Sequence, residues 1–127
     1  MKLICIDASK FIERDNPSSK IYSEMVKQGC SKSDDGTPKT MLDLQTYWDL
    51  LDSEKQMVLV LYENHKGTEP KDFSKRFLDY LSKFDGLICI VSSQPEENVC
   101  LKQFSDSDTH LIENIVKWIK ASLLENL

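Results

Sequence analysis

Side chains capable of metal binding or acid–base chemistry follow two of the most apolar runs in the chain. Asp7 comes directly after the run at residues 3–6, and Glu63 and His65 follow the run at residues 57–62. In parallel α/β sheets the carboxyl ends of the strands face the ligand crevice, so residues in these positions can meet. A carboxylate or imidazole there would bind a ligand or a divalent metal. The competing interpretation is structural: Asp7 caps the turn that follows it, and His65 is an exposed turn residue.

No complete catalytic or cofactor motif surrounds these residues. Phosphate-binding loops need several close glycines, and the chain has four glycines, none of them paired. A nucleophilic triad needs a histidine beside a serine or cysteine, whereas His65 and His110 are accounted for as turn and helix-surface residues. The cysteines and histidines show no zinc-ligand spacing. We therefore expect no catalytic residue, no resident metal and no cofactor.

Composition and charge narrow the function classes further. The 127 residues are 40% hydrophobic and 29% charged, which predicts a single globular domain over residues 1–127. The net charge of -5 disfavours a general nucleic-acid binder, because phosphate binding needs clustered Lys and Arg. No window reaches the ~18 apolar residues of a membrane span. Cys5 and Cys89 lie inside apolar runs, which predicts buried thiols in a reducing compartment, cytoplasmic or nuclear.

A βαβ unit in the second half of the chain is the clearest structural element. The continuous apolar runs at residues 57–62 and 87–91 predict strands buried on both faces of a sheet. Between them lies an apolar stripe with helical spacing, which predicts a helix packed on that sheet. Its members are Phe73, Phe77, Leu81 and Phe84. Strands buried on both faces are typical of an α/β domain with helices on each side of the sheet.

The remaining elements complete a small α/β fold. Residues 2–7 predict a first strand, and Thr40 with Asp43 approximates a capping box at the start of a helix. Residues 29–39 are rich in turn formers, which predicts a mobile surface loop, and residues 99–104 have the mixed polarity of an edge strand. With a helix before that loop and another at the C-terminus, the predicted order is β-α-α-β-α-β-β-α. The fold class is a three-layer α/β sandwich whose mixed, mainly parallel sheet has about four strands.

The last predicted helix carries more apolar surface than one packing face needs. Its core stripe is Ile112, Ile115, Val116, Ile119 and Leu123. Leu111 and Trp118 widen the apolar arc to roughly half the circumference, whereas a helix packed on one sheet needs about 100°. The excess predicts that Leu111 and Trp118 contact a protein partner or a second copy of the chain. The alternative is that Trp118 covers the edge of the domain.

The order of elements from Thr40 to the C-terminus resembles the thioredoxin-like fold. The loop at residues 65–69 stands where that family has Trp-Cys-Gly-Pro-Cys, with Lys66 and Glu69 at the two cysteine positions. Disulfide exchange needs a thiolate of low pKa, so the resemblance implies a fold without the family's redox activity.

The first strand also resembles the opening of PIN-domain nucleases. The match is the stretch at residues 4–9, and it implies that Asp7 helps to hold a divalent metal. The later acidic motif of that family is not reproduced at residues 91–96. The favoured function is therefore a non-catalytic protein–protein interaction module, a subunit or adaptor of a larger intracellular complex. A metal-dependent PIN-like nuclease, or a degenerate enzyme using Asp7, is the alternative.

Overall fold

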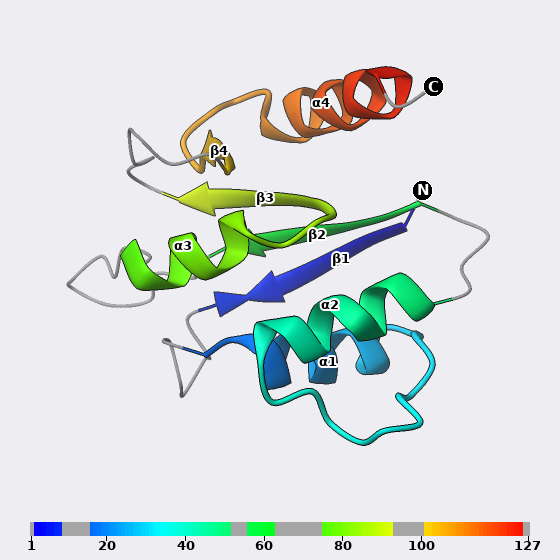
Figure 1. Cartoon of the computed structure of the whole chain (residues 1–127). Helices are drawn as coiled ribbons and strands as arrows, with labels where there is room; N and C mark the ends of the chain where they lie inside the picture. Colours follow the sequence, from blue (N-terminus) through cyan, green and yellow to red (C-terminus); the bar gives the residue numbers. More distant parts are fainter. Residues whose placement is uncertain (1, 9–15, 52–55, 63–74, 93–100, 126–127) are drawn as a thin grey trace.

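Four strands form one sheet, and their order in space equals their order in the sequence. The computed structural model describes residues 2–8, 16–51, 56–62, 75–92 and 101–125. The elements are β1 Lys2–Asp7, α1 Ser18–Lys27, α2 Met41–Leu50, β2 Met57–Tyr62, α3 Lys75–Ser82, β3 Leu87–Ser92, β4 Lys102–Ser105 and α4 Leu111–Glu125. The strands lie in the order β1-β2-β3-β4, and all three pairings are parallel (Figure 1). The predicted α/β class and element order are confirmed.

The first face of the sheet is covered by α1, α2 and α3. Ile4 and Ile6 of β1 and Leu59 and Leu61 of β2 are all fully buried there, against apolar side chains of the three helices. The stripe on α3 is confirmed where it is described: Phe77, Leu81 and Phe84 belong to this core, and Phe73 lies outside the described residues. The start of α2 also follows the prediction, because the Thr40 hydroxyl accepts a hydrogen bond from the Asp43 N–H (3.1 Å).

The second face is covered by α4. Ile115 and Ile119 of this helix pack with Val58 and Val60 of β2 and with Cys89, Val91 and Phe104 of the next two strands. Central strands β2 and β3 are therefore buried on both faces, as their continuous apolar runs predict. Figure 1 shows α4 on the β4 side of the sheet and α1 with α2 on the β1 side. Among the described elements only α4 packs on this face, and it lies nearer to β4 than to β1.

The loop between α1 and α2 is anchored, in contrast to the mobile loop expected from its composition. The Tyr22 hydroxyl accepts from the Ser33 N–H (3.0 Å), and the Tyr47 hydroxyl donates to the Ser31 carbonyl (2.6 Å). The two tyrosine rings meet edge to face with centroids 4.9 Å apart. Turn-forming residues predicted an irregular segment correctly, but the two buried aromatic side chains beneath it supply hydrogen bonds that composition does not reveal.

Candidate functional site

Three sides of α4 have different surroundings. Ile115 and Ile119 point into the second core, and Trp118 meets Phe104 of β4 edge to face with ring centroids 6.0 Å apart. At 3.6 residues per turn, Ile112 and Val116 lie roughly 120–160° around the helix from Trp118, on the side away from β4. Ile112 is 70% exposed, and Val116 is half-buried. The flank of α4 that faces β1 therefore presents apolar side chains to solvent.

This exposure corrects the predicted core stripe. Ile112 was expected to pack in the core with Ile115 and Ile119, but only the latter two are buried. The reason is that α4 sits on the β4 side of the sheet, so none of the described helices and strands packs on its flank turned toward β1 (Figure 1). Leu111 and Trp118 are half-buried and pack against the second core. Their role as partner contacts stays a prediction.

Strand β1 is exposed on the same face of the sheet. Ile4 and Ile6 point into the first core, so Leu3 and Cys5 point the other way, beside Val58 and Val60 in the register. Leu3 is 37% exposed, and Cys5 is exposed as well, although partial burial raises the pKa of its thiol. The buried thiol predicted for Cys5 is therefore wrong, because α4 does not reach β1; the buried thiol predicted for Cys89 is confirmed.

We call this region the open face and define it as Leu3 and Cys5 of β1 with Ile112 and Val116 of α4. Sequence reasoning missed these four residues as a surface, since each lies in an apolar run or stripe that looks like core. A usable signal was the count of elements: one terminal helix, about 10–12 Å across, is too narrow to cover four strands spaced ≈ 4.7–4.9 Å apart.

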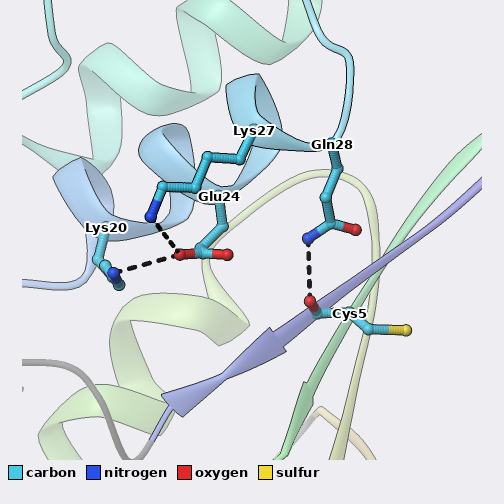
Figure 2. Close-up of polar contacts among 5 residues, drawn as sticks. All are labelled: Cys5, Lys20, Glu24, Lys27 and Gln28. Atoms are coloured by element: carbon cyan, nitrogen blue, oxygen red, sulfur yellow. Dashed lines mark hydrogen bonds and ion pairs between the residues drawn. The ribbon is translucent and has the colours of Figure 1, made fainter.

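The edge of β1 next to the open face is protected by α1. The Lys2 N–H donates to the Gln56 carbonyl (2.8 Å), so Ile4 and Ile6 also pair toward β2 while the backbone of Cys5 points outward. Gln28 fills that outward position, donating from its side-chain amide to the Cys5 carbonyl (3.0 Å) (Figure 2). A satisfied edge acceptor is a poor template for an added strand. The open face is therefore better suited to a helix than to an edge-pairing strand.

An ion-pair cluster holds the same surface of α1. Glu24 lies 3.2 Å from the Lys20 ammonium and 3.4 Å from that of Lys27 (Figure 2). Partial burial acts to raise the pKa of Glu24, but hydrogen bonds and charge attraction from the two lysines outweigh it and lower the pKa. The cluster keeps α1 charged on the outside, next to the Gln28 contact at the strand edge.

Asp7 ends β1 at the carboxyl end of the sheet. It is half-buried and pairs in register with Tyr62 of β2. Burial, and then the charge of Asp7, raise the pKa of the Tyr62 phenol, so the carboxylate and phenol are near each other. Glu63 and His65 lie outside the described residues. Within the part of the chain that the structure describes, no group of three or more His, Cys, Asp and Glu side chains could hold a metal ion.

An open cavity of about 480 Å³ lies on the other side of the molecule, between the anchored loop and α2. It is lined mainly by polar residues, among them Asp34 and Asp35 of the loop, with Asp43, Tyr47 and Leu50 on the α2 side. Ligand pockets are typically apolar with a few placed polar groups, which is the reverse of this composition. We therefore place the candidate functional site on the open face.

The fold and this surface define a three-layer α/β domain with one half-covered sheet face. The chain belongs to the family NACHT C-terminal Alpha/Beta 1, which matches residues 1–122. It is therefore an α/β module of the kind found in NACHT-containing proteins. Neither a curated protein nor a solved structure matches the chain. None of the described helices is long and apolar enough to cross a membrane. The thioredoxin-like and PIN-like resemblances stay predictions.

Proposed function

We propose that this chain is a non-catalytic protein-interaction module, a subunit or adaptor within a NACHT-containing protein or complex inside the cell. The observation that carries the proposal is the open face, where Leu3 of β1 is 37% exposed and Ile112 of α4 is 70% exposed. Membership in the NACHT C-terminal Alpha/Beta 1 family supports a place within a NACHT-containing protein. The thioredoxin-like resemblance supports a binding role as well, since it comes without the redox cysteines.

Burial of the open face by a partner is energetically favourable. A sheet in a three-layer domain buries both faces, and here no described helix packs on the β1 end of one face. Fully burying an exposed Ile or Leu side chain gains about 1.5–3 kcal/mol, so covering Leu3 and Ile112 would contribute substantially to binding. Exposed apolar side chains that gather on one face of a domain are a feature of protein contact sites.

The experiment is a binding comparison between matched surface variants. Ile112→Asp places a charge in the open face, and Leu42→Asp places the same charge on α2, where Leu42 is 76% exposed. The native partner is first identified by capture from the source cells and is then purified for titration. We expect Ile112→Asp to weaken its binding at least about tenfold, and Leu42→Asp to leave the affinity unchanged.

Folding is checked for both variants by circular dichroism and thermal unfolding. Because both wild-type side chains are mostly exposed, both variants should keep the parental fold. A folded Ile112→Asp variant that binds the partner as well as the parent does would refute the proposed site.

A further inference from the structure

The exposed flank of α4 carries opposite charges on either side of an apolar residue. Glu113 and Lys120 are both exposed and lie seven residues apart, which is about two helical turns, so they share one side of the helix. Val116 lies between them on that side. The Glu113 carboxylate lies 3.7 Å from the His110 imidazole, a contact that carries opposite charges only when the histidine is protonated. Along this flank, acidic Glu113, apolar Val116 and basic Lys120 therefore follow one another.

Such a sequence of side chains is complementary to its own reverse. A two-fold axis that crosses the helix at right angles near Val116 generates a second, antiparallel α4. In this pair each Glu113 lies opposite Lys120 of the other copy, and the two Val116 side chains meet. A two-fold interface requires this property, because the same patch must meet itself. We propose that the open face binds a second copy of this chain, with the two α4 helices antiparallel and paired through Glu113, Val116 and Lys120.

The position of the open face supports this occupant. The flank with Val116 lies on the side of α4 away from Phe104 of β4, so a second α4 packed there would lie on the side of the helix toward β1, the strand of Leu3 and Cys5. At ~1.5 Å per residue, the 15 residues of α4 extend over about 22 Å, longer than the six residues of β1 at ~3.3 Å each. Strand addition is the other common route to a second copy, and the hydrogen bond from Gln28 to the Cys5 carbonyl opposes it.

This inference rests on the proposed function, since it names the partner of the same surface. The experiment is sedimentation equilibrium of the whole chain over a wide concentration range, near pH 8, where a histidine side chain is usually uncharged. We expect a reversible dimer. Glu113→Lys and Lys120→Glu should each weaken dimerisation about tenfold, because each creates two like-charge contacts across the axis.

The double variant Glu113→Lys/Lys120→Glu restores opposite charges in reversed order, and we expect its dimerisation constant to return to within about threefold of the parent's. Lys83→Glu is the matched control: it makes the same charge change at an exposed position that directly follows α3, on the other face of the sheet, and should have little effect.

Three results would overturn the inference: a parent chain that stays monomeric throughout, a dimer indifferent to the single reversals, or a double variant as weak as the singles. A monomeric chain whose heterologous binding is lost in Ile112→Asp would remove only this inference. If Ile112→Asp weakened neither dimerisation nor partner binding, the proposed function would be refuted.

Discussion

The side chain of Gln28 donates a hydrogen bond to the backbone carbonyl of Cys5, 3.0 Å away, and so occupies an acceptor on the outer edge of β1 (Figure 2). The same residue of β1 exposes its thiol on the sheet face. One strand is therefore protected at its edge and open on its face. This combination restricts an incoming partner to the face, where helices pack, and disfavours uncontrolled strand pairing.

Gln28→Ala tests the protective role of this contact. It removes the donor to the Cys5 carbonyl, so we expect a faster concentration-dependent aggregation on heating and a loss of up to about 1 kcal/mol in unfolding free energy. Light scattering during a thermal ramp and urea unfolding measure the two effects. Lys32→Ala changes an exposed residue of the loop that follows α1 and serves as control. Equal aggregation of both variants and the parent would contradict the role assigned to Gln28.

The stripe on α3 should behave as core. Phe77 is only 3% exposed and packs in the first core, so Phe77→Ala should cost about 3–5 kcal/mol of unfolding free energy. Tyr80 lies on the same helix with 39% exposure, and Tyr80→Ala should cost less than about 1 kcal/mol. Denaturant unfolding decides the matter. A loss below about 1 kcal/mol for Phe77→Ala would mean that α3 does not turn Phe77 toward the first core.

The two flanks of α4 should respond differently to substitution. Trp118→Ala removes the contact with Phe104 and part of the second core, so we expect a stability loss of about 1–3 kcal/mol. Ile112→Asp should leave stability nearly unchanged and weaken binding. Parallel unfolding and binding titrations compare them. If Trp118→Ala instead left the fold intact and weakened association roughly 30-fold, the partner surface would extend to Trp118, as the apolar arc of the sequence predicts.

Stability should fall at alkaline pH. Burial, and to a lesser extent neighbouring groups, raise the pKa of Cys89 from 9.0 to about 12 and that of Tyr47 from 10.0 to about 12. Both groups keep their protons longer in the folded state than in the unfolded chain. Their contribution is therefore complete below about pH 9 and is lost progressively as the pH rises toward 12.

Tyr47→Phe provides the corresponding measurement. The variant loses the hydrogen bond to the Ser31 carbonyl, so it should be less stable than the parent at neutral pH. Above about pH 10 its unfolding free energy should decline less steeply, because one of the groups whose pKa is raised on folding is gone. Tyr80→Phe, at an exposed position, should decline as the parent does. Parallel decline of all three chains would show that Tyr47 does not titrate differently on folding.

Much of the fold follows from local patterns. The runs around Leu59 and Ile90 are apolar at every position, which only strands buried on both faces require, and both are fully buried. Thr40 caps α2 because its hydroxyl reaches an N–H three residues on, a contact that the sequence alone defines.

The candidate site was harder to foresee because exposure depends on the whole domain. Leu3 and Cys5 follow the same apolar pattern as the buried β2, and only the position of α4 on the β4 side leaves them uncovered. Ile112 obeys the spacing of the core stripe on α4, yet that stripe is wider than the contact with the sheet. Gln28 gave no signal at all, since its contact spans 23 residues of sequence and depends on how α1 crosses β1.

The central claim is that the open face is where this domain meets its partner, and the Cys5 thiol lies within that face. The most direct measurement is therefore the alkylation rate of Cys5, followed by peptide mass spectrometry, in the free monomer and in the saturated complex or dimer. Cys89, which is buried, is the internal control. Partial burial raises the pKa of the Cys5 thiol, so the reaction is followed at a fixed alkaline pH. The account predicts that Cys5 reacts faster than Cys89 in the monomer and at least about tenfold more slowly when the partner is bound. An alkylation rate of Cys5 that is the same in the monomer and in the saturated complex would contradict it.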